Sequence, residues 1–171
     1  TSNLLHIFNH ALMKSAIFLA LAAVMYRIGN VQIDNFRGLG KQMPWTMAAI
    51  VLAGLSLIGV PLTVGFVSKW YLLVAIIEQG NWVVAGLILM GSLLAVIYVW
   101  RIVEVAYFKE PATAQKGDVL EGAAGGSTEA PLSFLIPIWL LVGANIYFGI
   151  DTRFSTQLAQ SAAQSLFGVS P

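Results

Sequence analysis

Long apolar runs separated by short polar stretches dominate this chain. An α-helix of about 20 mostly apolar residues crosses the hydrocarbon core of a bilayer. Five apolar segments are predicted to be membrane spans, at about residues 4–27, 44–59, 61–79, 82–108 and 131–150. The pattern therefore predicts an all-α fold, a polytopic membrane helical bundle of about five transmembrane helices, one of them discontinuous.

Two polar segments lie outside the predicted spans. Residues 109–130 are rich in glycine, alanine and charged side chains and are predicted to be a loop. Residues 151–171 place Phe154, Leu158 and Leu166 near helical spacing. This tail is interpreted as a short interfacial helix or a frayed end, and residues 1–150 as one transmembrane domain.

The composition supports membrane insertion and excludes several functions. Hydrophobic residues make up 58% of the chain and charged residues 10%, against about 25% charged residues in soluble domains. The net charge of +1 gives no electrostatic basis for nucleic-acid binding, and there is no cysteine to ligate a metal. We expect neither a cofactor nor a metal. No signal peptide is recognised at Thr1, so we expect the chain to be part of something longer.

Three basic side chains follow one face of the first span. His6, His10 and Lys14 are spaced four residues apart, which places them on one helix face over about 12 Å. Lysine near a helix end can extend its ammonium group to the membrane surface. However, twelve apolar or small residues follow Lys14, up to and including Tyr26, so we expect Lys14 to lie inside the bilayer.

These residue types suit proton transfer. Histidine titrates near neutral pH, and a low-dielectric site disfavours the charged form of lysine, so both can exchange protons. Chains of such groups are found in pumps and transporters. Metal binding by His6 and His10 is the weaker alternative, because no third ligand is evident nearby.

A second polar site lies in the third segment. Gly59 and Pro61 interrupt the helix and Gly65 permits further irregularity, which predicts a helix break. Interrupted helices at membrane depth occur only where they are buried in protein or line a cavity. Lys69 follows about 12 Å further along. A tight loop with a snorkelling lysine is the alternative, but we interpret Lys69 as a buried base.

Other polar residues are less decisive. Arg101 and Glu104 form a candidate ion pair, either lining a water path or bridging at the interface. Ser56, Ser92 and the Gly86/Gly91 pair are interpreted as sites of close helix packing. Counting basic residues by the predicted spans does not decide the orientation: Arg27, Arg37, Lys41 and Arg153 fall on one side, and Arg101, Lys109 and Lys116 on the other.

The ordered set of motifs resembles a known family. "HIFNHALMKSAIFL", "GLGKQMP" and "LSLIGVPLTVGFVSKWYLL" are similar to the antiporter-like membrane subunits of respiratory complex I and of Mrp-type cation/proton antiporters. The resemblance covers about residues 4–107. It implies that His6, His10, Lys14 and Lys69 belong to a mid-membrane proton path, and that Gly59, Pro61 and Gly65 shape the helix break.

Within that family, "GFVSKWYLL" and "RIVEVAYF" look most like the D subunit of bacterial Mrp antiporters. The resemblance thus implies the C-terminal portion of a proton-translocating subunit in a Na⁺/H⁺ antiporter, in a bacterial inner membrane, with other membrane subunits as partners. Antiporter-like subunits of complex I, or of membrane-bound hydrogenases, are the alternative. Part of the family's proton path lies upstream of these motifs, so this chain is expected to hold only part of it.

Overall fold

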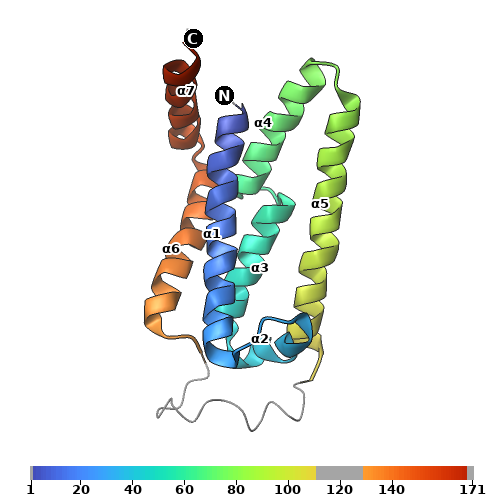
Figure 1. The fold of residues 1–171 in the computed structure, drawn as a ribbon, viewed down its shortest axis with the longest axis vertical. Helices are drawn as coiled ribbons and strands as arrows, with labels where there is room; N and C mark the ends of the chain where they lie inside the picture. Colours follow the sequence, from blue (N-terminus) through green and yellow to red (C-terminus); the bar gives the residue numbers. More distant parts are fainter. Residues whose placement is uncertain (1, 111–128, 169–171) are drawn as a thin grey trace.

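The computed structural model describes residues 2–110 and 129–168, and within them it contains helices and connecting turns but no strand. Figure 1 shows these helices as an elongated bundle. The helices are α1 (Ser2–Ile28), η1 (Ile33–Phe36), α2 (Leu39–Gln42), α3 (Pro44–Ile58), α4 (Val64–Glu78), α5 (Trp82–Val103), η2 (Glu104–Phe108, a π-helical turn), α6 (Leu132–Ile150) and α7 (Arg153–Phe167).

Three of the described helical segments are long and apolar enough to cross a membrane: Leu4–Ile28, Trp82–Phe108 and Leu132–Ile150. Their length and composition confirm the predicted fold class, an all-α membrane helical bundle. Helix α1 contacts α3, α4, α6 and α7, whereas α5 packs mainly on α3 and α4. The side chains on α1 therefore meet most of the other elements.

Helices α3 and α4 divide the height of the bundle between them. Each has 15 residues, about 22 Å of helix. Figure 1 shows α3 in the lower half and α4 in the upper half, joined by a turn at mid-height, and α1 and α5 run alongside both. The predicted discontinuous element is thus built from two segments that the sequence analysis treated as neighbouring spans.

The turn between α3 and α4 has unusual backbone geometry. Helix α3 ends at Gly59, whose φ of 97° lies in the left-handed region that favours glycine. Pro61 lies within the turn, and Leu62 has a φ of 72°, the one positive φ at a non-glycine residue in the described chain. The Leu62 side chain is 68% exposed.

Glycines let this turn pack tightly on both sides. A Cβ atom at Gly65 would lie 1.7 Å from the Ser56 carbonyl oxygen and 2.9 Å from the sulfur of Met13. On the other side, a Cβ atom at Gly149 of α6 would lie 2.5 Å from the backbone of Leu62. The turn is therefore held between backbone surfaces that leave no space for a side chain.

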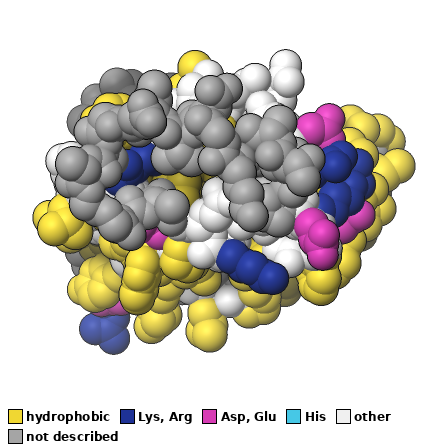
Figure 2. All heavy atoms as spheres, turned by 90° about the horizontal axis from the view of Figure 1, so that it is seen from below, with side chains coloured by type: hydrophobic (Ala, Val, Ile, Leu, Met, Phe, Trp, Pro, Cys, Tyr) yellow, Lys and Arg dark blue, Asp and Glu magenta, His cyan; other side chains and the backbone are white. Residues whose placement is uncertain are grey.

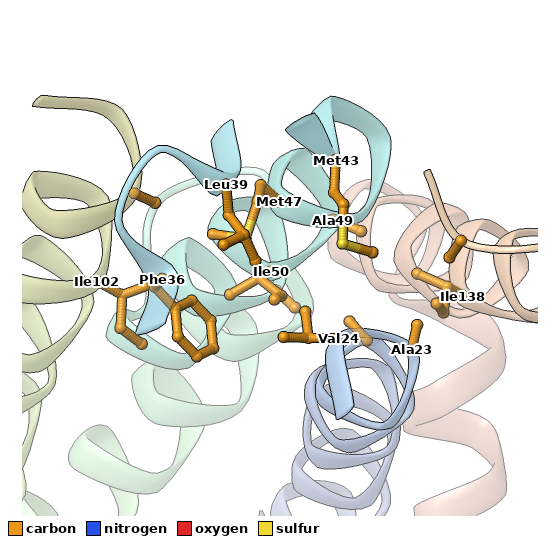
Figure 3. Close-up of a cluster of buried hydrophobic side chains, with 14 of the residues drawn as sticks. Ala23, Val24, Phe36, Leu39, Met43, Met47, Ala49, Ile50, Ile102 and Ile138 are labelled. Carbon is orange, nitrogen blue, oxygen red and sulfur yellow. The ribbon is translucent and has the colours of Figure 1, made fainter. Parts of the chain in front are cut away.

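The hydrophobic core lies at the lower end of the bundle. Figure 3 shows Val24 of α1, Phe36 of η1, Ile50 of α3 and Ile138 of α6 directed toward one another, and all four are buried. Buried apolar side chains of α1, η1, α2, α3, α5, η2 and α6 form this cluster, which joins the short helices η1 and α2 to the main bundle.

A polar contact fixes the start of α3 beside this core. Met43, at the N-cap position, provides no side-chain cap. Instead Glu129 accepts hydrogen bonds from the Trp45 amide (2.8 Å) and the Thr46 hydroxyl (2.5 Å), while its backbone carbonyl accepts one from Arg27. A carboxylate at this position satisfies the unpaired amides of a helix N-terminus and complements its dipole.

Basic residues that the sequence analysis placed on opposite sides lie at the same end. Because α3 and α4 together make one passage along the bundle, α5 ends beside α2 and the last turn of α1 (Figure 1). Figure 2 views this end and shows charged side chains gathered beside apolar ones. The basic side chains of the segments at this end are Arg27, Arg37, Lys41, Arg101 and Lys109.

The remaining polar segments are only partly described. Most of the predicted loop at 109–130, with Lys116, lies outside the described residues. In the tail, residues Arg153–Phe167 form α7, which packs against α1. The position of this helix at a membrane interface remains a prediction.

Substituting Gly65→Ala tests the backbone contact at the turn. We expect a loss of at least about 3 kcal/mol of stability, because the obstructing atom is a backbone oxygen, which cannot rotate away as a side chain can. The measurement is the thermal unfolding midpoint and the yield of folded intact protein in detergent. Gly91→Ala is the matched control, since a Cβ there meets nothing within 4 Å. Equal stability of the two variants would contradict the packing described.

Candidate functional site

The ammonium group of Lys69 lies at the end of α3. Its Nζ donates to the carbonyl oxygens of Leu57 (2.7 Å) and Ile58 (3.0 Å) and to the hydroxyl of Ser92 on α5 (2.8 Å). The side chain is half-buried. Lys69 therefore joins three helices, its own α4, the C-terminus of α3 and the middle of α5.

The helix break accounts for this position. The last carbonyls of a helix have no partner within it, and the helix dipole places negative potential there. Gly59 allows the lysine to approach, since a Cβ at that position would lie 3.3 Å from Lys69 Cδ. The break thus creates acceptors for a cation, and α4 supplies the cation 11 residues after Ile58.

The two histidines lie side by side next to the first turns of α4. Their ring centroids are 5.6 Å apart, and His6 Nδ1 is 3.2 Å from the Ser68 hydroxyl. That hydroxyl donates to the Gly65 carbonyl, so it can accept a hydrogen bond from an N–H at His6 Nδ1. Both histidines interact electrostatically with Lys69. The structure therefore brings His6, His10 and Lys69 together.

Lys14 occupies a different environment. It is exposed in this structure, and its Nζ lies 5.5 Å from the centre of the Phe18 ring. It interacts electrostatically with His10. His10 therefore lies between Lys14 and the group around Lys69, and Lys14 itself faces away from the bundle formed by the described helices.

Buried amides complete the site and were missed by the sequence analysis. Asn9, fully buried, donates to the Val64 carbonyl at the start of α4 (3.4 Å), and its own Oδ1 atom has no partner among the described residues. Asn145 of α6 accepts from the hydroxyl of Ser56 on α3 (3.1 Å). Asn9 lies three residues after His6, so it shares the helix face of the histidines, and that spacing was a signal available in the sequence.

Two residues interpreted as packing positions have polar roles instead. Ser56 bonds Asn145 and Ser92 bonds Lys69, because both hydroxyls point into the bundle at the height of the break. Gly86 and Gly91 were interpreted as sites of close helix packing. Within the described chain no helix packs closely on them, since a Cβ at either would meet nothing within 4 Å.

Arg101 and Glu104 form an ion pair apart from this group. Arg101 donates to Glu104 at 2.9 Å, and its side chain is 50% exposed. The pair lies nine residues beyond Ser92 on α5, about 13 Å along the helix. Its position is near the charged end of the bundle, and a role in a water path remains a prediction.

No metal centre emerges among the described residues, where no group of three or more His, Cys, Asp or Glu side chains could hold an ion. His6 and His10 therefore have no third ligand in the part of the chain described. The arrangement instead places titratable groups in sequence along α1 and across to α4.

Comparison with known proteins identifies the family. Residues 1–95 match the family described as "NADH:quinone oxidoreductase/Mrp antiporter, TM". The chain is 37% identical over 164 residues to NADH-quinone oxidoreductase subunit N of Desulforudis audaxviator, an alignment covering 94% of this chain and 32% of that protein. It is 31% identical over 169 residues to F(420)H(2) dehydrogenase subunit N of Methanosarcina mazei, covering 92% and 32%.

A solved structure shares the fold. A chain of the Mrp complex from Dietzia sp. superposes with a TM-score of 0.81 at 21% identity, covering 97% of this chain and 37% of that one. The chain thus spans about a third of the length of the curated relatives described above. With the family match extending over more than half of its residues, this chain belongs to the antiporter-like membrane subunits shared by NADH:quinone oxidoreductases and Mrp antiporters.

Proposed function

We propose that this chain is part of a proton-translocating membrane subunit, and that His6, His10, Lys14 and Lys69 relay protons through it. The observation that carries the proposal is the convergence of His6, His10 and Lys69 at a helix break. Intramembrane ionisable residues are costly and mark ion pathways, and family membership supports the same role.

In the proposed relay the protons pass between Lys14, His10, His6 and Lys69, with waters between groups that are not in direct contact. His10 connects the two ends, since it interacts with both lysines. The exposed position of Lys14 supports a continuation of the path into protein that covers this face of α1. A lysine in the middle of an apolar helix is too costly to leave facing lipid.

We further propose that α3 and α4 cross the membrane as one interrupted span and that the basic end of the bundle is cytoplasmic. Five basic residues lie in segments at that end, whereas Arg153 of α7 lies near the opposite end (Figure 1). An excess of lysine and arginine marks the cytoplasmic side. A multi-pass location in a bacterial inner membrane, with other membrane subunits as partners, is part of the same proposal.

The relatives favour one type of complex over another. Subunit N of NADH-quinone oxidoreductase and of F(420)H(2) dehydrogenase are similar over more than 90% of this chain. We therefore propose a proton-pumping subunit of a redox-driven respiratory complex. The segments "GFVSKWYLL" and "RIVEVAYF" favour a second candidate, the D subunit of an Mrp-type antiporter that exchanges Na⁺ for protons.

Replacing the relay lysines tests the proposed proton path. Lys69→Ala and Lys14→Ala are each expected to reduce proton transport by the intact complex about a hundredfold, because a positioned proton-transfer group is removed. Lys69→Arg is expected to be equally impaired, since arginine keeps the charge but does not release its proton. Transport is measured in proteoliposomes with a pH-sensitive dye.

The control is Lys41→Ala, at an exposed residue in the short helix α2, which is expected to transport normally. Normal transport by assembled Lys14→Ala and Lys69→Ala complexes would rule out the relay.

The two candidate complexes differ in what drives transport. In everted vesicles that contain the intact complex, a redox-driven pump is expected to acidify the interior when an electron donor such as NADH is added, and quinone-site inhibitors should block this. An Mrp-type antiporter would instead collapse a pre-formed pH gradient on addition of Na⁺, without an electron donor. The second result would favour the antiporter and reject the respiratory complex.

The orientation can be tested by cysteine labelling, because the chain itself contains no cysteine. We expect Arg153→Cys to react with a membrane-impermeant maleimide in intact cells with the outer membrane opened. Lys41→Cys should react only after the inner membrane is permeabilised. Both side chains are exposed in the structure. The reverse pattern of labelling would contradict the proposed orientation.

A further inference from the structure

The three partners of the Lys69 ammonium group account for all of its hydrogen-bonding capacity. An ammonium has three N–H donors and no acceptor. The two α3 carbonyls and the Ser92 hydroxyl lie 2.7 to 3.0 Å from Nζ, so each donor has one acceptor. The arrangement around Lys69 satisfies all three donors of the charged form.

The three acceptors differ once the proton leaves. A neutral amine keeps two N–H groups and gains a lone pair. The carbonyls of Leu57 and Ile58 can only accept, but a hydroxyl can also donate. Ser92 Oγ donates at present to the Ile88 carbonyl at 3.3 Å, a long contact, and rotation about its C–O bond would direct the same proton to Nζ. The carbonyls can accept from the two remaining N–H groups, but only Ser92 can also donate to the lone pair, so it can bond the nitrogen as acceptor in the charged form and as donor in the neutral form.

We propose that Ser92 is a positioning residue for proton transfer at Lys69, holding the lysine nitrogen against α5 in both its charged and its neutral form. Both contacts are stronger to the ammonium than to the neutral amine, but only the Ser92 contact can reverse its direction and bond the lone pair when the proton leaves. This inference rests on the proposed function, in which Lys69 carries a relayed proton.

In the proposed step, Lys69 transfers one proton to His6, directly or through water. The lysine nitrogen is left with a lone pair, and His6 gains the proton. The histidines of α1 are the titratable groups with which Lys69 interacts. Helix α3 has no titratable side chain, and Tyr147 is the sole one on α6. On α5, Tyr98 is about 9 Å and Arg101 about 13 Å beyond Ser92.

The role of α3 in this step follows from its dipole. Its C-terminal carbonyls stabilise a cation but have no comparable attraction for a neutral amine. When Lys69 is neutral, the α3 carbonyls hold it less strongly, and the bond from Ser92 to its lone pair helps to keep the amine close to the position from which it can be protonated again. Without Ser92 the lone pair would have no donor among these three partners, and the neutral side chain would be held less firmly at the break.

The test is proton transport by the intact complex in proteoliposomes, measured across a range of pH. Ser92→Ala is expected to lower the rate about tenfold or more, as for loss of a hydrogen bond to a charged group. It should also displace the pH profile by about one unit. Ser92→Thr keeps the hydroxyl and should restore the rate to within about threefold and the profile to that of the unsubstituted protein.

A matched control moves the hydroxyl without removing it from the helix. The double variant Gly91→Ser/Ser92→Ala places it about 100° around α5, away from Lys69, and should behave as Ser92→Ala does. Should Ser92→Ala fail to assemble, Ser92→Cys supplies a weaker donor of similar size and should give an intermediate rate. An unchanged transport rate and pH profile in Ser92→Ala would overturn the inference. It would also be overturned if Ser92→Ala lowered the transport rate equally at every pH and Ser92→Thr did not restore it.

The lysine variants separate this inference from the proposed function. If Lys69→Ala stops transport while Ser92→Ala has no effect, the relay stands and the role of Ser92 is rejected. If Lys69→Ala transports normally, the relay itself is rejected. In the Lys69→Ala background, adding Ser92→Ala should cause no further change, because the group that Ser92 positions is already absent.

Discussion

The structure depends on how the backbone is satisfied where α3 stops at mid-height of the bundle. In hydrocarbon, no water is available to bond the last carbonyls of a helix. The Leu57 and Ile58 carbonyls are instead bonded by Lys69, and the Ser56 carbonyl lies against Gly65. An unbonded helix end would be unfavourable in hydrocarbon, and here its carbonyls bind the ammonium group of Lys69 instead. The structural requirement of the break and the chemistry proposed for it are met by the same side chain.

Much of this was predictable from the sequence, for physical reasons. Long apolar runs specify membrane helices, and a four-residue spacing specifies a shared face, so His6 and His10 were placed correctly relative to each other. Gly59 and Pro61 indicated the interruption because both residue types restrict helix continuation. Lys69 was predicted as a buried base, and it lies half-buried at the break.

The remaining features required tertiary structure. The sequence does not reveal that α3 and α4 stack at different heights, because 15 apolar residues are compatible with either a short span or half of a broken one. This ambiguity also placed the basic residues of α1 and α5 on opposite sides. The cap on α3 comes from Glu129, 84 residues after Trp45, and no local pattern indicates such a contact. Ser92 looks like a packing residue until Lys69 is seen beside it.

The leucine in the turn has a consequence for the surface of the bundle at the break. A left-handed backbone costs a residue with a side chain about 1–2 kcal/mol more than it costs glycine. Leu62 adopts this conformation, yet its side chain is largely exposed and fills no core. Glycine there would relax the backbone but remove this exposed side chain. Leucine thus gives the turn between α3 and α4 an apolar outer surface where glycine would leave bare backbone.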